Sequence, residues 1–173
     1  TVDYRAINRV TKPAPFPLPL IESELMLAAG AKCFGSLDFP KGFWQIANTK
    51  RAAQAYAFAT HDGVYEPDRM QMGATNSAAH FQREVTKWLR KKNLLHKGVQ
   101  SFIDDLLLYA RTWQDLLEIW QRVFDTLIEA GFFVSPQKTD LWKLEVVWCG
   151  NLLTANGVEV DPARLAALKD IPE

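Results

Sequence analysis

The sequence predicts an α+β fold in which helices pack against an antiparallel sheet. Two long stretches, residues 75–92 and 112–131, repeat apolar residues with the period of an α-helix. Residues 33–38 and 99–110 are shorter apolar runs of strand length, and a pair of aspartates interrupts the second run. This order of helices and neighbouring strands is typical of an α+β sandwich.

Length and composition exclude several classes of protein. The chain has 173 residues, enough for one domain with a hydrophobic core or for two small lobes. It is 48% hydrophobic with zero net charge, which argues against disorder and against a globally basic nucleic-acid binder, while a local basic groove stays open. With only two cysteines, Cys33 and Cys149, the composition argues against a zinc site and favours a reduced cytosolic or nuclear setting. We expect no membrane span and no signal peptide.

The first 30 residues predict a strand, a connector and a helix. Residues 2–7 alternate weakly and are expected to form a strand. Four prolines in residues 12–19 exclude a helix or a central strand, so this stretch is an extended connector. Pro19 suits the first turn of a helix, and Gly30 suits its end. The apolar residues that share one face of this helix are Ile21, Leu25 and Ala28.

A series of short elements precedes the first long helix. In order they are a buried strand at 33–38, a short helix at 41–46, a strand at 54–60, a turn at 61–63 and two short strands at 64–65 and 70–72. The strand at 54–60 is indicated by Tyr56 and Phe58, which share one face, and the turn is indicated by the sequence His-Asp-Gly.

Two longer helices flank an acidic hairpin that spans about residues 99–110. The first helix begins near Thr75, and its apolar stripe is Phe81, Val85, Trp88 and Leu89. In the second, Thr112 and Asp115 resemble a capping box, and Gly131 ends the helix. Its apolar residues are Leu116, Leu117, Trp120, Val123, Phe124, Leu127 and Ile128. We then expect a strand at 132–134, a hairpin of residues 144–149 and 152–154 around Gly150-Asn151, and a helix from Asp161-Pro162.

The aspartates carry the clearest functional signal. Asp104 and Asp105 lie inside an apolar run, and Asp38 ends another. Carboxylates are rarely buried unless they are paired or bound to a cation. An acidic turn is the simpler interpretation, because aspartate is common in turns. Two strand-end carboxylate sites that meet across a sheet would instead suit two hard divalent cations.

Five motifs follow one another along the chain. They are Val2-Asp3-Tyr4-Arg5-Ala6-Ile7-Asn8 with Pro17-Leu18-Pro19; Ser36-Leu37-Asp38 with Gly42-Phe43-Trp44-Gln45-Ile46; Met72-Gly73 with Asn76 and Phe81-Gln82; Phe102-Ile103-Asp104-Asp105; and Gly131, Pro136 and Lys138 with Trp148-Cys149-Gly150 and Gly157-Val158. In this order they resemble reverse transcriptases of gypsy-type (Metaviridae) LTR retrotransposons. The resemblance covers nearly the whole chain, and the order of the motifs is more specific than any one of them.

The resemblance implies a polymerase palm with part of the fingers. Residues 1–36 would be a partial fingers strand, the connector and a helix; residues 37–155 would be the palm, with an interleaved fingers segment at about 47–75; and residues 156–173 would begin a thumb or connection. The implied activity is that of an RNA-directed DNA polymerase, a nucleotidyltransferase that joins a dNTP to a primer 3′-OH with two metal ions. Without upstream fingers, thumb and RNase H, the isolated fragment is expected to polymerise poorly or not at all.

The resemblance also assigns the chemistry to particular residues. Asp38, Asp104 and Asp105, with the backbone carbonyl of Phe39, would hold two Mg²⁺ ions, for which Mn²⁺ can substitute. Lys138 resembles the lysine that protonates the leaving pyrophosphate, although any single lysine is more often solvated surface.

Further residues resemble those that bind the nucleotide and the primer. Phe43 resembles a steric gate that rejects a ribose 2′-OH, with a plain core aromatic as the alternative. Met72 and Gly73 would line the nucleotide, with Gln82 on the helix behind them. The family usually has one proline in the turn before Met72-Gly73 and another at the start of the following helix. Here these positions are Gln71 and Ala78, so the turn and the helix start lose the stiffness that a proline gives. Trp148, Cys149 and Gly150 resemble a primer grip, with an ordinary hairpin as the alternative.

The implied partners are an RNA or DNA template with its primer, dNTP and the rest of a polyprotein, with no membrane. The implied location is the cytoplasm, in a virus-like particle, with the nucleus as a second location. The departures in the nucleotide pocket leave a second hypothesis, an exapted and catalytically silent domain that binds nucleic acid or a protein. A third is the palm of a pararetrovirus or RNA-virus polymerase. The three retained aspartates argue against a silent scaffold, because unpaired carboxylates cost stability.

Overall fold

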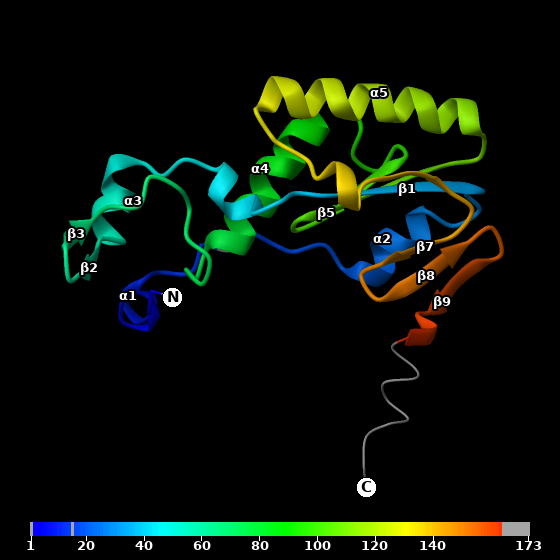
Figure 1. The fold of residues 1–173 in the computed structure, drawn as a ribbon. Coiled ribbons are helices and arrows are strands. Elements are labelled where there is room, and N and C mark those ends of the chain that lie inside the picture. Colours follow the sequence, from blue (N-terminus) through cyan, green and yellow to red (C-terminus); the bar gives the residue numbers. More distant parts are fainter. Residues whose placement is uncertain (1, 15, 164–173) are drawn as a thin grey trace, which may run out of the picture.

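A four-stranded antiparallel sheet organises the computed structural model, which describes residues 2–14 and 16–163 (Figure 1). The strand order is β4–β5–β1–β6, so β5 and β1 are the central strands. The strands are β1 (Cys33–Asp38), β4 (Val99–Phe102), β5 (Asp105–Ala110) and β6 (Asp140–Lys143). Strands β1 and β5 pair along their full length, so the last residue of β1 lies opposite the first residue of β5.

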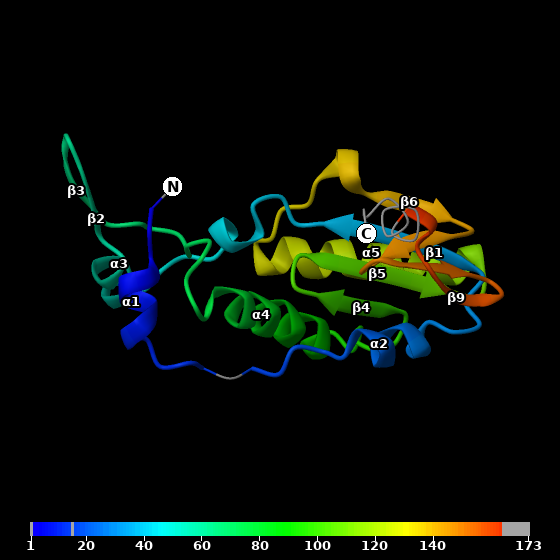
Figure 2. The same ribbon diagram turned by 90° about the horizontal axis from the view of Figure 1, so that it is seen from below.

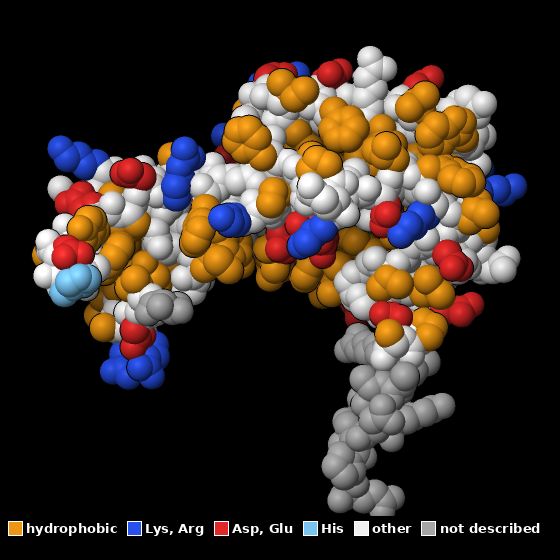
Figure 3. Space-filling view, viewed as in Figure 1, with side chains coloured by type: hydrophobic (Ala, Val, Ile, Leu, Met, Phe, Trp, Pro, Cys, Tyr) orange, Lys and Arg blue, Asp and Glu red, His pale blue; other side chains and the backbone are white. Residues whose placement is uncertain are grey.

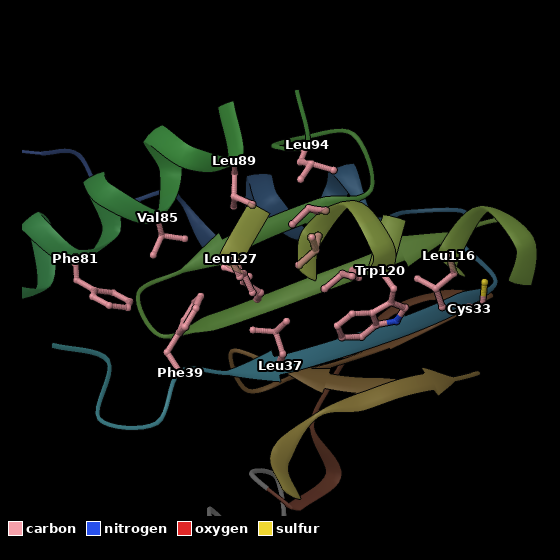
Figure 4. Packing of buried hydrophobic residues seen from close by; sticks show 14 of the residues in the cluster. Cys33, Leu37, Phe39, Phe81, Val85, Leu89, Leu94, Leu116, Trp120 and Leu127 are labelled. Atoms are coloured by element: carbon pink, nitrogen blue, oxygen red, sulfur yellow. The ribbon is translucent and has the colours of Figure 1, made fainter. Parts of the chain in front are cut away.

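Helices α4 (Ser77–Lys91) and α5 (Trp113–Ala130) cover one face of this sheet (Figure 1). Their buried residues share a core with alternate residues of β1 and β5 (Figure 4): Leu37, Phe81, Val85, Leu89, Leu106, Leu108, Leu116, Trp120 and Leu127. Gly35 leaves room for this packing, because a Cβ atom there would lie 2.6 Å from the Trp120 ring. The two long helices are therefore confirmed, although Leu117 and Ile128 are 53% and 76% exposed and lie outside the core.

The opposite face is covered by α2 (Ile21–Leu27) and by a second antiparallel sheet (Figure 2). That sheet consists of β7 (Val146–Trp148), β8 (Asn151–Thr154) and β9 (Gly157–Val160). Successive residues of a strand point to opposite faces, so Phe34 and Leu107 join a second core there, with Leu25, Val146 and Trp148 among its members. The predicted α+β fold is confirmed, and both faces of its main sheet are covered.

The remaining elements lie at the end of the molecule away from β7–β9 (Figure 2). They are α1 (Arg5–Val10), α3 (Lys50–Ala55) and the hairpin of β2 (Phe58–Thr60) and β3 (Gly63–Tyr65). A short 3₁₀ helix, η1 (Gly42–Gln45), follows β1, and another, η2 (Pro136–Lys138), follows α5. Within the described part of the chain, every helix is too short or too polar to cross a lipid bilayer.

Two strands predicted near the N-terminus are partly or wholly helical. Residues 2–7 were expected to be a strand, but helix α1 begins at Arg5, where the Asp3 carboxylate accepts a hydrogen bond from the Arg5 N–H at 2.9 Å. The expected strand at 54–60 begins only at Phe58, because residues 50–55 form α3. Thr49 caps α3 by accepting a hydrogen bond from the Ala52 N–H, a signal that the alternation of aromatic residues obscured.

Other differences arise where contacts distant in sequence decide the backbone. Residues 70–72 form no strand, and residues 132–134 are held by the side chain of Gln45 instead of by a sheet. The edge strand β6 and the last strand β9 were not predicted. The second hairpin turns at Cys149-Gly150, one residue earlier than expected. The helix expected from Asp161-Pro162 lies almost wholly outside the described residues.

Candidate active site

Three aspartates meet where β1 ends and β5 begins. Asp38 and Asp105 are paired across the two strands, and Asp104 lies in the two-residue turn between β4 and β5. The Phe39 N–H donates to the carbonyl oxygen of Asp104 at 3.1 Å, which ties the chain after β1 to this turn. In the middle of the face in Figure 3, acidic side chains gather beside a basic one where these strands end.

The turn has a strained backbone. Its first residue, Ile103, has φ 53°, a left-handed conformation that β-branched residues rarely adopt. Asp104 is not among the described residues with positive φ, so the turn has the pattern of type II′, which usually places glycine first. Some other interaction must therefore stabilise Ile103 in this conformation.

Gln82 of α4 supplies that interaction. The Ile103 N–H donates to Gln82 Oε1 at 2.5 Å. Gln82 Nε2 donates to Ser101 Oγ at 2.9 Å, and to the Ser101 carbonyl oxygen and Thr86 Oγ1 at 3.1 Å each. Gln82 lies on the helix behind the Met72-Gly73 loop, and its side chain is 0% exposed. In this structure Gln82 positions the turn that carries the aspartates.

Lys138 reaches the carboxylates from the segment after α5. The Ser135 N–H donates to the carbonyl oxygen of Asp38 at 3.2 Å, which docks η2 beside the end of β1. Lys138 Nζ then lies 3.3 Å from Asp38 Oδ2. The Lys138 side chain is 68% exposed, so this ion pair adds little to stability. The effect of this ion pair is to place the Lys138 ammonium group next to the aspartates.

The aspartates destabilise one another. Burial raises the pKa of Asp105, the negative charges of Asp104 and Asp38 raise it further, and Lys138 opposes the rise. Because the folded-state pKa lies above the unfolded value, the stability contributed by protonated Asp105 is lost as the pH rises through the folded pKa. At neutral pH the ionised cluster therefore costs folding free energy that a bound cation would recover.

The donor atoms fit a hard divalent cation. Among the described residues, His, Cys, Asp and Glu side chains form no group of three or more that could hold a metal ion as they stand. The aspartates nevertheless offer oxygen ligands and excess negative charge, which Mg²⁺ and Mn²⁺ prefer. The carbonyl oxygen of Phe39 accepts a hydrogen bond from the Gly42 N–H at 3.1 Å and keeps a second lone pair. Binding would require the aspartate side chains to turn toward a common point.

The β7–β8 hairpin brings the predicted primer-grip residues to the same place. Cys149 and Gly150 have φ 49° and 74°, as in a type I′ turn, and Trp148 before them is 2% exposed. Burial raises the pKa of Cys149 to about 12, and the charges of Asp105 and Asp104 contribute. The Cys149-Gly150 turn therefore lies close enough to Asp104 and Asp105 for their charges to affect the pKa of Cys149.

Phe43 lies on η1, directly after β1. Its ring packs edge-on against Phe81, with 5.7 Å between ring centroids, and it stays partly exposed. Gln45 fixes η1, because its Nε2 donates to the carbonyl oxygens of Pro40 at 3.0 Å and Phe133 at 2.9 Å. This role of Gln45 could not be predicted from the sequence, because its second partner lies 88 residues away.

Met72 and Gly73 lie in the loop between β3 and α4. Met72 is 59% exposed, and Gly73 has φ 86°, so the segment is accessible and its glycine adopts a left-handed conformation. The loop leads directly into α4, whose Gln82 holds the aspartate turn. Asn8, a motif residue with no role assigned from sequence, contacts this loop through both ends of its carboxamide.

The chain matches one protein family over most of its length. The family described as "Reverse transcriptase (RNA-dependent DNA polymerase)" matches residues 1–153. The chain is 30% identical over 171 residues to the retrovirus-related Pol polyprotein from transposon 297, and 29% identical over 172 residues to that from transposon gypsy, both from Drosophila melanogaster. These matches cover 99% of this chain but only 16% of each polyprotein, so the chain spans about a sixth of their length.

Solved structures of a foamy viral protease-reverse transcriptase have the same fold. A form called dRH, in complex with double-stranded DNA, superposes with a TM-score of 0.90 at 26% identity, covering 99% of this chain and 30% of that chain. The complex with an RNA/DNA hybrid gives a TM-score of 0.88 at 26% identity, covering 100% of this chain and 23% of that chain.

Replacing Gln82 by Leu should release the strained turn at similar side-chain volume. The Ile103 N–H would lose its buried acceptor, so we expect the free energy of unfolding to fall by about 2 kcal/mol or more in urea denaturation. Gln121→Leu, an exposed change on α5, is the matched control and should stay within about 0.5 kcal/mol of the parent. Equal stability of Gln82→Leu and the parent would contradict this role.

The Cys149 thiol should report on the carboxylates. With a pKa of about 12, it should react slowly with iodoacetamide at pH 8. Asp104→Asn or Asp105→Asn removes a negative charge, lowers the pKa of Cys149 and should speed its alkylation, followed by mass spectrometry of the Cys149 peptide. Asp125→Asn, on the exposed side of α5, should change nothing. An unchanged rate in both turn variants would place the thiol away from the carboxylates.

Proposed function

The chain belongs to the reverse transcriptase family, and we propose that it forms the polymerase centre of a retroelement Pol polyprotein. The proposed reaction is RNA-directed DNA polymerisation, in which the primer 3′-oxygen bonds to the α-phosphorus of a dNTP and pyrophosphate leaves. One observation carries the proposal: Asp38 and Asp105 face each other across β1 and β5, with Lys138 Nζ 3.3 Å from Asp38 Oδ2. Nothing observed in residues 2–14 and 16–163 favours the alternative of a silent scaffold.

Reverse transcriptases generally use divalent metal ions, and we assign two Mg²⁺ ions to this site, with Mn²⁺ as a substitute. Asp38, Asp104 and Asp105 would hold them, together with the carbonyl oxygen of Phe39. Such ions, when bound, lower the pKa of the primer hydroxyl and neutralise charge on the triphosphate. The raised pKa of Asp105 supports this assignment, because bound cations would offset both causes of the rise, which are burial and the repulsion from Asp104 and Asp38.

Lys138 is the proposed proton donor to the leaving group. As the bond between the α-phosphorus and the pyrophosphate oxygen breaks, the Nζ ammonium would give a proton to that oxygen. The side chain is 68% exposed, so it is free to turn from Asp38 toward the pyrophosphate. This exposure, together with the short distance to Asp38, supports a proton-donor role better than a purely structural one.

The proposed substrates follow from the surroundings of the aspartates. Phe43 would lie under the sugar and exclude a 2′-OH, while Met72 and Gly73 would line the incoming dNTP. Trp148, Cys149 and Gly150 would hold the primer terminus, which is supported by the effect of the carboxylates on the pKa of Cys149. An RNA or DNA template is supported by the related foamy viral enzyme, whose structures contain double-stranded DNA and an RNA/DNA hybrid.

The wider context stays part of the proposal. Residues 1–36 and the segment at about 47–75 would belong to the fingers, residues 37–155 to the palm, and residues 156–173 to the start of a thumb or connection. The chain would act with the rest of the polyprotein, in a cytoplasmic virus-like particle or in the nucleus.

Mn²⁺ binding tests the proposed metal site. Calorimetry of the 173-residue chain should show binding that Asp38→Asn and Asp104→Asn each abolish or weaken at least about tenfold, since each removes a charged oxygen ligand. Asp125→Asn is the control and should bind as the parent does. Polymerisation by the processed Pol polypeptide that contains this chain should be lost in the first two variants.

Either of two results would remove the metal site. One is a parent that takes up no Mn²⁺, and the other is binding that survives both substitutions unchanged. The chain would then be better described as a scaffold that keeps the shape of a polymerase.

Phe43→Val should relax the choice of sugar. A smaller side chain leaves space for a 2′-OH, so the ratio of kcat/KM for dNTP to that for rNTP should fall about tenfold or more. The measurement is single-nucleotide extension of a primer by the processed Pol polypeptide. Phe58→Val, the same exchange on the distant strand β2, should keep the parent ratio. An unchanged ratio in Phe43→Val would show that Phe43 is a core aromatic residue and does not select the sugar.

A further inference from the structure

In the loop between β3 and α4, residues 66–76, side-chain contacts with the N-terminal segment hold the second half, residues 71–76. The first half is held by Asn48 and by the backbone of Ile46. The loop contains no helix or strand, and α1 lies beside it in both ribbon views (Figures 1 and 2). This loop includes Met72 and Gly73, the residues proposed to line the incoming nucleotide. What fixes the loop therefore decides the shape of that part of the pocket.

Asn8 of α1 binds the loop at two points. Its Nδ2 donates to the carbonyl oxygen of Gly73 at 2.8 Å, and its Oδ1 accepts a hydrogen bond from the Thr75 N–H at 3.0 Å. One carboxamide thus holds two backbone groups on either side of Ala74. Two bonds from one rigid planar group fix both the position and the orientation of the backbone between them.

The side chains of Tyr4 and Asn76 tie the middle and the end of the same loop to the N-terminal segment. Tyr4 donates its hydroxyl to Gln71 Oε1 at 2.8 Å. Asn76 accepts a hydrogen bond from the Ala14 N–H at 2.9 Å and donates to the carbonyl oxygen of Lys12 at 3.1 Å. Asn8 acts between these anchors, at the part of the loop that contains the glycine.

Gly73 makes such a contact necessary. Its φ is 86°, and glycine passes readily between left-handed and right-handed conformations. A loop that pivots at Gly73 would present Met72 in several orientations. The bond from Asn8 to the Gly73 carbonyl selects one of them.

We propose that Asn8 is a positioning residue for the incoming nucleotide, acting through the backbone of Gly73 and Thr75. The inference rests on the proposed function, because only that function places a nucleotide against Met72 and Gly73. Water reaches both hydrogen bonds of Asn8, so they add little to global stability. Their loss should appear in nucleotide affinity and leave the melting temperature nearly unchanged.

The test compares Asn8→Ala, Asn8→Asp and Val10→Ala. Asn8→Ala removes both bonds, whereas Asn8→Asp keeps the acceptor for Thr75 and loses the donor to Gly73. Val10 ends the same helix, is 80% exposed, and serves as the matched control. Steady-state extension by the processed Pol polypeptide gives KM for dNTP and kcat, and hydrogen exchange of the 173-residue chain gives protection of the Thr75 amide.

The expected result is a change in KM with little change in kcat. Asn8→Ala should raise KM for dNTP about tenfold, with kcat within about twofold of the parent. Thr75 should exchange at least about tenfold faster in Asn8→Ala and stay protected in Asn8→Asp, whose KM should be intermediate. Val10→Ala should match the parent in every measurement.

Three results would overturn the inference. An active parent whose KM is unaffected by Asn8→Ala would overturn it alone and leave the proposed function standing. A fall in kcat at constant KM, with a lower melting temperature, would show a structural role only. The same rise of KM in Val10→Ala would assign the effect to α1 in general. An inactive parent would instead remove the proposed function, and the inference would fall with it.

Discussion

The hydrogen bond from the Ile103 N–H to Gln82 Oε1 is the constraint on which the site depends. It holds a β-branched residue in a left-handed conformation, which costs about 1–3 kcal/mol where the surrounding structure does not enforce it. That conformation closes the turn in two residues and places Asp104 and Asp105 against the end of β1. Gln82 can enforce it because its neighbour Phe81 is buried in the core between α4 and the sheet. Packing of α4 thus fixes the position of the aspartates.

Electrostatics opposes this arrangement, which indicates that the site serves function more than stability. The pKa of Asp105 rises because the residue is half-buried and because the turn brings it and Asp104 to the carboxylate of Asp38. Lys138 offsets part of the repulsion, but its exposed ion pair contributes at most about 1 kcal/mol. Strain and like-charge repulsion therefore persist together at one point of an otherwise well-packed sheet. Such a combination is typical of a site whose ligands are cations.

Periodicity explains which elements could be predicted from sequence. Strand β1, helices α4 and α5 and the acidic hairpin each bury a regular apolar pattern, so their prediction succeeded. Helices α1 and α3 bury too little for a pattern to show. At their starts, Asp3 and Thr49 accept local hydrogen bonds from the N–H groups of Arg5 and Ala52. In the site, the aspartates could be predicted from their apolar surroundings. The roles of Gln45 and Gln82 could not, because a glutamine that bonds to distant backbone leaves no periodic signal.

The lack of the two prolines that the family usually has near Met72 and Gly73 affects how the proposed nucleotide pocket is held in shape. A proline limits φ in the folded and the unfolded chain alike, so it stiffens a loop without help from other segments. Here Gln71 and Ala78 stand at those positions, and residues 71–76 are bonded to residues 4–14 through the side chains of Tyr4, Asn8 and Asn76. Asn48 and Ser77 bond to other backbone groups of the same loop. The bonds to residues 4–14 exist only when the N-terminal segment is docked against the loop. The shape of the proposed pocket therefore depends in part on α1, and a change that displaces α1 would loosen residues 71–76 even though the aspartates, on the main sheet, stay in place.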